Sequence, residues 1–164
     1  MKFLFASDSF KGSLTSRRTA ELLTQAAGEI FPGCVCGSIE IADGGEGTAD
    51  AVLSAAGGTR IYMTAAGPLM ERVPVSYVQL DSTRAVMEMA AASGLPLVPA
   101  GKRNPLETTT YGTGEMIKDA LSKGFRDISI AIGGSATNDG GMGCMRGLGR
   151  RCLGGSRREP GGRG

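Results

Sequence analysis

Residues 2–13 read KFLFASDSFKGS, and this stretch decides the fold of the 164-residue chain. Its apolar part, 2–6, predicts a buried strand, and the glycine- and acid-containing part after it predicts a turn. In the next segment, 15–30, apolar residues recur at helical spacing. The same order of strand, turn and helix returns with a strand at 35–41 and a helix at 45–56. Alternating strands and helices predict a parallel sheet in an α/β fold.

Three glycine-rich turns that contain acids each follow a short apolar run, at 7–13, 42–48 and 133–141. A turn between a strand and a helix directs several backbone N–H groups to one point, where an anion can bind. Acids in such a turn can hold a cation or orient a hydroxyl group. The turns therefore predict a phosphate-handling α/β enzyme rather than a structural module. The third turn matches neither the P-loop nor the GxGxxG spacing, and a purely structural turn is its alternative.

The alternation of strand and helix changes near residue 65, which we take as a candidate domain boundary. Residues 1–64 are expected to form the N-terminal part of a first α/β domain, and residues 65–149 the start of a second. The turn at 81–83 predicts a hairpin. The remaining predicted elements are strands at 60–64, 73–80, 84–89 and 127–132, and helices at 113–123 and from about 140.

Residues 150–164 show no periodicity and few apolar side chains, which predicts a disordered C-terminal tail. Residues 1–141 contain 12 Lys and Arg against 15 Asp and Glu, a balance of −3, whereas residues 142–164 contain six Arg and one Glu, a balance of +5. This abrupt change leads to the hypothesis that the end of the chain is out of frame or artificially terminated. A functional arginine arm is the less favoured alternative, because no aromatic residues are interleaved.

Composition excludes several classes of function. The acidic body lacks the basic footprint of a nucleic-acid-binding protein. The chain contains no histidine, which excludes a histidine base, a Ser-His-Asp triad and histidine-ligated metal. The spacing of Cys34 and Cys36 is too short for a zinc knuckle or a redox CxxC, so incidental thiols are expected. No apolar stretch is long enough to span a membrane and no signal peptide is evident, which predicts a cytoplasmic protein.

The first two turns supply candidate site residues. Asp8, Ser9 and Lys11 follow the first predicted strand, at the sheet edge where ligands of open α/β sheets bind. The lysine offers a point charge to a phosphate or carboxylate; in the alternative reading it is solvated and Asp8 caps the helix. Asp43 and Glu46 can hold Mg²⁺ or accept a proton. Their spacing equally fits a capping box at the second helix.

Later segments add further candidates. Asp139 can bind Mg²⁺ or order the third turn. Glu88 lies in an apolar run and needs a partner if it is buried, unless it faces outward from its strand. Arg103, in a proline-rich loop, is a candidate anion ligand or a solvated charge. Side-chain donors in the third turn are Ser135, Thr137 and Asn138.

Taken together, the motifs resemble those of the glycerate kinase type 1 family. They occur in family order, cover about residues 1–148, and are collectively specific although each is weak alone. The matching stretches are 8–14, 42–48, 67–69, 88–95, 103–105, 110–115 and 133–141.

This resemblance implies an ATP- and Mg²⁺-dependent kinase that phosphorylates a hydroxyl of D-glycerate. It favours 2-phosphoglycerate as the product, although the residues themselves do not separate the 2-hydroxyl from the 3-hydroxyl. It also implies two α/β domains with parallel or mixed sheets, Rossmann-like or flavodoxin-like, and an active site in the cleft between them. The expected partners are D-glycerate and ATP, without nucleic acid or membrane.

The resemblance also suggests roles for residues at matching positions. We expect Asp8, Lys11 and Asp43 to be catalytic, and Glu46 and Asp139 to hold the metal, with Asp43 and Asp139 as alternatives for metal or base roles. The residues expected to bind substrate or phosphate are Ser9, Glu88, Arg103, Ser135, Thr137 and Asn138.

Members of this family are much longer, so the chain is expected to be a truncated N-terminal fragment. Parts of both domains would then be missing. The alternative function is a catalytically inactive fragment or a remnant that binds a small ligand. A different phosphate-binding α/β enzyme, such as a sugar-phosphate isomerase, is disfavoured by the family order of the motifs.

Overall fold

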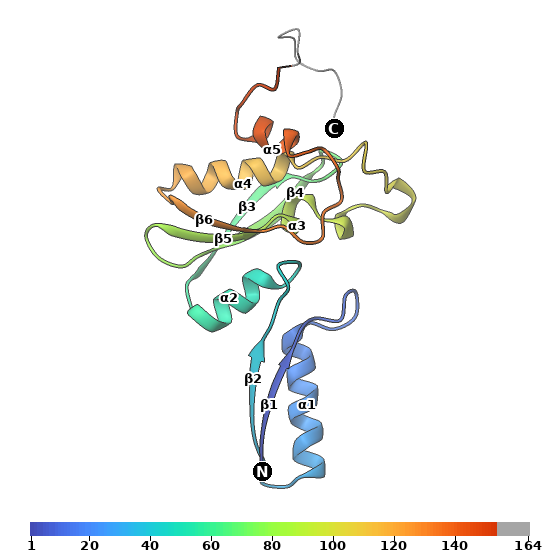
Figure 1. The fold of residues 1–164 in the computed structure, drawn as a ribbon, viewed down its shortest axis with the longest axis vertical. Coiled ribbons are helices and arrows are strands. Elements are labelled where there is room, and N and C mark those ends of the chain that lie inside the picture. Colours follow the sequence, from blue (N-terminus) through green and yellow to red (C-terminus); the bar gives the residue numbers. More distant parts are fainter. Residues whose placement is uncertain (154–164) are drawn as a thin grey trace.

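The computed structural model describes residues 1–153, and Figure 1 shows their arrangement. A two-stranded sheet stands at one end and a four-stranded sheet at the other, with α2 between them. The elements in chain order are β1 (Lys2–Ser7), α1 (Ser16–Ile30), β2 (Val35–Glu40), α2 (Thr48–Ala56), β3 (Thr59–Ala66), β4 (Arg72–Gln79), β5 (Arg84–Glu88), α3 (Ala90–Ser93), the 3₁₀ turns η1 (Leu95–Leu97) and η2 (Ala100–Lys102), α4 (Tyr111–Ser122), β6 (Asp127–Ala131) and α5 (Met142–Gly147).

The two-stranded sheet pairs β1 with β2 in parallel, in a register from Lys2 opposite Val35 to Ser7 opposite Glu40. One face packs against α1, where the ring of Phe3 lies 5.4 Å from that of Phe31. Thr15 caps α1 by accepting a hydrogen bond from the backbone N–H of Arg18. This is the strand–turn–helix–strand unit that the first stretch of sequence predicts.

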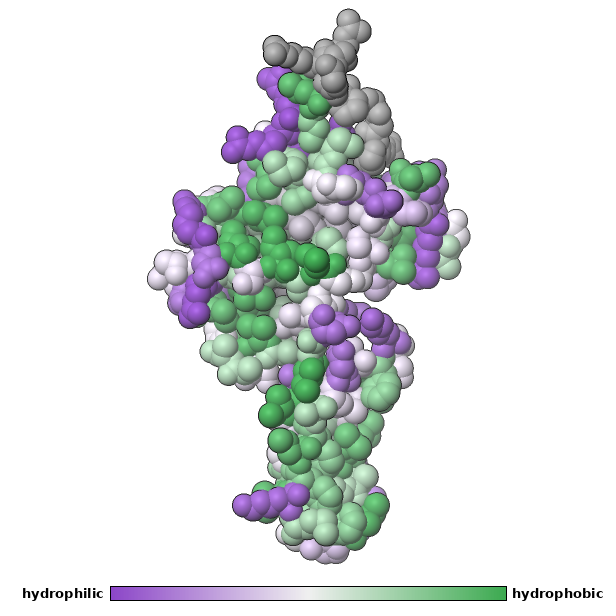
Figure 2. Space-filling model, in the orientation of Figure 1, coloured by the Kyte–Doolittle hydropathy of each residue, from purple (hydrophilic) through white to green (hydrophobic). Residues whose placement is uncertain are grey.

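The opposite face of the two-stranded sheet carries exposed apolar side chains. Leu4, Val35 and Ile39 are 66%, 62% and 52% exposed. Their positions alternate with those that face α1, because successive strand residues point to opposite faces. Figure 2 shows hydrophobic residues over much of this end of the molecule.

The four-stranded sheet has the order β3-β4-β5-β6, with β5 and β6 parallel and the other neighbours antiparallel. Helix α4 covers one face, and α2 approaches the other, contacting β4 and β5 as well as β2 (Figure 1). The core lies between the sheet and α4, where Tyr77, Met87 and Met116 are fully buried. Tyr77 meets Phe125 edge to face, and its hydroxyl donates to Asp119 at 2.8 Å. Burial, followed by this bond to Asp119, raises the pKa of Tyr77.

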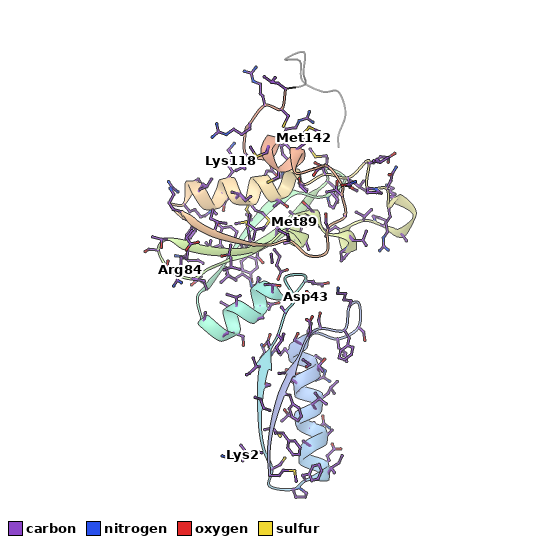
Figure 3. The ribbon with its side chains drawn as sticks, in the orientation of Figure 1. Lys2, Asp43, Arg84, Met89, Lys118 and Met142 are labelled. Carbon is purple, nitrogen blue, oxygen red and sulfur yellow. The ribbon has the colours of Figure 1, made fainter. Side chains whose placement is uncertain are left out.

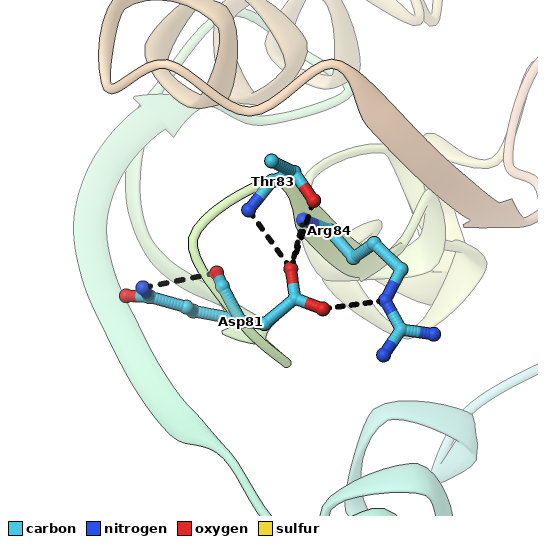
Figure 4. Close-up of polar contacts among 4 residues, drawn as sticks. Asp81, Thr83 and Arg84 are labelled. Carbon is cyan, nitrogen blue, oxygen red and sulfur yellow. Dashed lines mark hydrogen bonds and ion pairs between the residues drawn. The ribbon is translucent and has the colours of Figure 1, made fainter.

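Asp81 organises the predicted hairpin between β4 and β5 (Figure 4). One of its carboxylate oxygens accepts hydrogen bonds from the backbone N–H groups of Thr83 and Arg84 and from the Thr83 hydroxyl. The other oxygen accepts from the Arg84 guanidinium at 2.7 Å. These bonds, with that from the Thr83 backbone first, hold the pKa of Asp81 well below its usual range.

The predicted α/β class with parallel and mixed sheets is confirmed. The capping box predicted from Asp43 and Glu46 is wrong, because α2 begins at Thr48 after a turn in which Gly47 adopts a φ of 92°. Asp43 instead accepts from the N–H of Gly45 at 2.9 Å. Only glycine adopts such a backbone conformation without strain, and it has no side chain with which to cap the helix.

Two further predictions concern the division and the end of the chain. The candidate boundary near residue 65 falls at the end of β3, which belongs to the four-stranded sheet, and the division into domains stays a prediction. Most of the predicted tail, 154–164, lies outside the described residues. Within residues 1–153, no helix has the length and apolar character required to cross a bilayer.

Candidate functional site

The first two glycine-rich turns meet at a cavity of about 740 Å³ between the two-stranded sheet and α2. Four predicted site residues line it: Ser9, Lys11, Glu46 and Glu88. They reach the cavity from the turns after β1 and β2 and from the end of β5. The carboxyl ends of strands in an α/β sheet are where such a convergence is expected. Figure 3 shows Asp43 at this junction of the two parts of the structure.

Lys11 of the first turn forms an ion pair with Asp43 of the second turn. Its Nζ lies 3.9 Å from Oδ2 of Asp43, and the two side chains are 82% and 57% exposed. Such an exposed pair contributes little to stability, so both charges remain available to a ligand. Asp8 accepts from the backbone N–H of Ser9 at 2.6 Å, and this contact orders the turn.

Glu88 links the two parts of the molecule at the cavity wall. Its Oε1 accepts a hydrogen bond from the backbone N–H of Ala49 at 2.6 Å. This N–H belongs to the first turn of α2, whose donors otherwise lack a side-chain cap. Burial raises the pKa of Glu88, and the hydrogen bond from Ala49 opposes that shift. The partner that an acid in this apolar run needs is therefore a helix N-terminus.

The third turn touches the second through backbone atoms. The N–H of Gly133 donates to the carbonyl of Gly44 at 2.8 Å. A Cβ at position 133 would lie 2.7 Å from the Cα of Gly45, closer than real Cβ contacts allow. Glycine at 133 thus permits β6 to end directly against the turn that contains Asp43.

The third turn, which contains the predicted donors, bonds within itself and to the loop before α4. Ser135 donates to the Thr137 carbonyl at 3.1 Å, and Thr137 donates to the Thr108 carbonyl at 2.7 Å. The backbone N–H of Asn138 donates to Pro105. Within residues 1–153, the cavity lining does not include Ser135, Thr137, Asn138 or Asp139.

Asp139 is buried and surrounded by donors of the chain itself. Oδ2 accepts from the Thr110 N–H at 2.7 Å, the Gly143 N–H at 3.2 Å and the Thr110 hydroxyl at 2.8 Å. Oδ1 accepts from the Gly141 N–H at 2.9 Å. Burial acts to raise the pKa of Asp139, but these hydrogen bonds, those of Thr110 foremost, bring it below its usual value. The carboxylate fastens the third turn to the start of α4.

Arg103 lies on the loop between η2 and α4, apart from the cavity. Its Nε donates to the Val98 carbonyl at 3.3 Å, and the residue is exposed. The structure thus brings the first turn, the second turn and Glu88 together, whereas Arg103 and the polar side chains of the third turn lie elsewhere.

Beyond the first turn and the start of α1, sequence reasoning missed three polar residues of the cavity wall: Glu40, Asp50 and Ser54. Glu40 ends β2, and Asp50 and Ser54 are one turn apart on α2. Helical spacing from the second turn could have indicated Asp50 and Ser54. Asp50 also forms an ion pair with Arg60 of β3, a contact between distant segments that no local pattern signals.

A second missed feature is the buried run Thr108-Thr109-Thr110. Thr108 donates to the Ala136 carbonyl at 2.7 Å, and Thr110 binds Asp139 as described. The signal available in the sequence was three successive threonines shortly before a predicted helix. Their hydroxyl groups hold the third turn in place.

A search against known families matches residues 3–164 to the glycerate kinase family, so the match extends beyond residue 148, where the motifs alone place its end. The glycerate 2-kinase of Escherichia coli (strain K12) is 48% identical over 92% of this chain, which covers 40% of that protein. The glycerate kinase of Bacillus subtilis (strain 168) is 48% identical over 99% of this chain and is covered to 43%.

A solved structure gives the same result. The crystal structure assigned as a glycerate kinase 2 from Salmonella typhimurium LT2 superposes with a TM-score of 0.75 at 44% identity, covering 97% of this chain and 43% of that one. The chain thus spans about two fifths of the length of the curated relatives it matches.

Proposed function

Because this chain belongs to the glycerate kinase family, we propose that it is part of an enzyme that transfers the γ-phosphoryl group of ATP to a hydroxyl of D-glycerate. The observation that carries the proposal is the shared cavity formed by the first two turns and Glu88. Its volume of about 740 Å³ lies within the range typical of small-molecule sites. The name of the Escherichia coli relative, glycerate 2-kinase, supports the 2-hydroxyl as the acceptor.

In this proposal, the first turn binds the anionic end of a substrate. Lys11 lines the cavity with its charge exposed, and Ser9 offers a hydroxyl beside it. Asp8 orders that turn through the Ser9 N–H. Phosphoryl transfer depends mainly on positioning and on neutralising the charge of the phosphate oxygens, which a lysine and backbone N–H groups can supply.

Asp43 is the proposed base or metal ligand, and Glu46 the second carboxylate. Asp43 is largely exposed beside Lys11, where it could accept the proton of the attacking hydroxyl. Within residues 1–153, no three or more metal-ligating side chains cluster in a way that would hold an ion. One or two carboxylates nevertheless fit Mg²⁺, which usually keeps waters and is shared with substrate phosphates. Bound there, Mg²⁺ would neutralise phosphate charge.

The other candidate residues lie outside the cavity lining, and the structure supports their proposed roles to different degrees. Ser135, Thr137, Asn138 and Arg103 remain proposed phosphate ligands, although a change in the loops would be needed to bring them to the cavity. Asp139 has both oxygens occupied by donors of the chain, which supports a loop-ordering role over the proposed metal role. Four free cysteines support a reducing, cytoplasmic location.

A coupled assay with ATP, Mg²⁺ and D-glycerate tests the proposal, with ³¹P NMR to identify the phosphorylated hydroxyl. Turnover that is abolished by Asp43→Asn and retained by the matched control Asp127→Asn, at an exposed acid of β6, supports the enzyme. Ligand binding without turnover would support the inactive, ligand-binding alternative. Turnover that survives Asp43→Asn would remove Asp43 from the mechanism.

A further inference from the structure

Two thiols lie side by side at the start of β2, away from the cavity. The sulfur atoms of Cys34 and Cys36 are 3.6 Å apart, and both residues are partly exposed. Cys36 pairs in register with Phe3 of β1, and the N–H of Cys34 donates to the Phe31 carbonyl at 3.1 Å. Cys34 thus closes the turn after α1 directly before β2, and Cys36 is the second residue of that strand, which brings the two thiols together.

The geometry disfavours a disulfide between these thiols. A disulfide bond is about 2.05 Å long, so the sulfur atoms would have to approach each other by about 1.5 Å. If the chain at Cys34 were as extended as β2, the two Cα atoms would be separated by about 6.6 Å, near the upper limit for a disulfide. A disulfide would therefore require both side chains to rotate and the backbone to stay near the edge of the permitted range.

A single bridging atom suits the same geometry better. With bonds of about 2.3 Å to sulfur, the length found for zinc thiolates, an atom spanning 3.6 Å makes a sulfur–atom–sulfur angle of about 103°. This angle is close to tetrahedral or pyramidal, and excludes the linear coordination of two-coordinate ions. Within residues 1–153, no third metal-ligating side chain completes a cluster, so the atom must bring its remaining bonds with it.

We propose that Cys34 and Cys36 form a dithiol site for a trivalent, pyramidal thiophilic centre of the organoarsenic class. An arsenic(III) atom that carries one organic group needs two further bonds, which the two sulfurs supply. With an aryl arsenoxide, two arsenic–sulfur bonds form and the arsenic–oxygen bond breaks. Both thiol protons leave with that oxygen as water, and no atom changes oxidation state.

The site is independent of the proposed kinase activity. Among the described residues, neither Cys34 nor Cys36 lines the cavity. The other two cysteines, Cys144 and Cys152, supply a control, because the Cys152 thiol donates to the Met142 carbonyl at 3.8 Å.

Phenylarsine oxide tests the site on the full chain, with intact-protein mass spectrometry and competition by 2-mercaptoethanol. The wild type and the double variant Cys144→Ser/Cys152→Ser are expected to form a 1:1 adduct with loss of water that survives an excess of monothiol. Cys34→Ser and Cys36→Ser are each expected to weaken binding at least about 100-fold, because the chelate is lost. Circular dichroism verifies that each variant is folded.

Three results of the mass spectrometry would contradict a dithiol site at Cys34 and Cys36. An adduct that persists in either single variant, or one that is lost in Cys144→Ser/Cys152→Ser, would overturn the proposal. An adduct in the wild type that monothiol removes would also overturn it, because a single sulfur would then be the ligand. If a serine variant does not fold, arsenic X-ray absorption of the wild-type adduct replaces it, and must show two sulfur neighbours.

Discussion

Glu88, at the end of β5, accepts a 2.6 Å hydrogen bond from the backbone N–H of Ala49, in the first turn of α2. The bond joins the four-stranded sheet to the helix that also contacts β2, so one carboxylate connects the two parts of the molecule. Its protonation is therefore expected to be coupled to stability.

Glu88→Gln is predicted to flatten the pH dependence of stability from about pH 4.3 upward, through the raised pKa of Glu88. Burial raises the pKa of Glu88. The folded state therefore keeps a proton that the unfolded state releases near the usual glutamate pKa of about 4.3. The free energy of unfolding contributed by Glu88 thus falls as the pH rises through the raised pKa. Urea unfolding at several pH values measures this slope. Glu107→Gln, at an exposed acid, should leave the slope unchanged.

Asp139→Asn is predicted to lower the free energy of unfolding by about 1–3 kcal/mol at pH 7, because buried donors lose their acceptor. The lowered pKa of Asp139 means that its stabilisation is present above about pH 3.9 and is lost as the pH falls through the folded-state value. The variant should therefore show a weaker loss of stability in acid. Denaturant titrations from pH 2 to 7 measure both effects, and equal acid sensitivity of the two proteins would contradict the assignment.

Gly133→Ala is predicted to destabilise the protein by about 1–3 kcal/mol, because the added Cβ meets backbone atoms of Gly44 and Gly45 at 2.9 and 2.7 Å. Gly28→Ala is the matched control. Its Cβ would have nothing within 4 Å, and it lies inside α1, where alanine stabilises a helix by about 0.5–1 kcal/mol. Thermal unfolding of both variants should shift in opposite directions. A neutral Gly133→Ala would mean that the contact between the second and third turns is loose.

Lys11→Met is predicted to weaken binding of ATP or D-glycerate by about three- to tenfold, with a smaller loss at high salt. The effect is modest because the Lys11 side chain is 82% exposed and its charge is screened. Isothermal titration at two ionic strengths measures it. Lys102→Met, at an exposed lysine of η2, is the control and should bind like the wild type. Similar losses in both variants would indicate only a general effect of charge.

The order of elements could be predicted because each depends on nearby residues. Helical spacing in α1 and the hairpin at Asp81 are local signals, and the structure confirms both. Candidate residues of the first two turns were likewise found from the strands that precede them, and Ser9, Lys11 and Glu46 line one cavity.

Contacts between distant segments could not be predicted. The acceptor of the Ala49 N–H is Glu88, 39 residues later, and the donors around Asp139 include Thr110, 29 residues earlier. No periodicity records such pairings. A local ambiguity explains why Asp43 and Glu46 suggested a capping box: their spacing fitted, but the left-handed Gly47 starts the helix later.

The sheet order β3-β4-β5-β6 follows the order of synthesis. As the chain leaves a ribosome, each strand of this sheet can pair with one that is already exposed, and none has to be inserted between two earlier strands. The hairpin of β4 and β5 needs only the short turn at Asp81, whereas β6 must wait for α4, because a parallel strand requires a crossover. Arrival of β6 is therefore expected to be the late step of cotranslational assembly, and it is the step that brings Gly133 against Gly44.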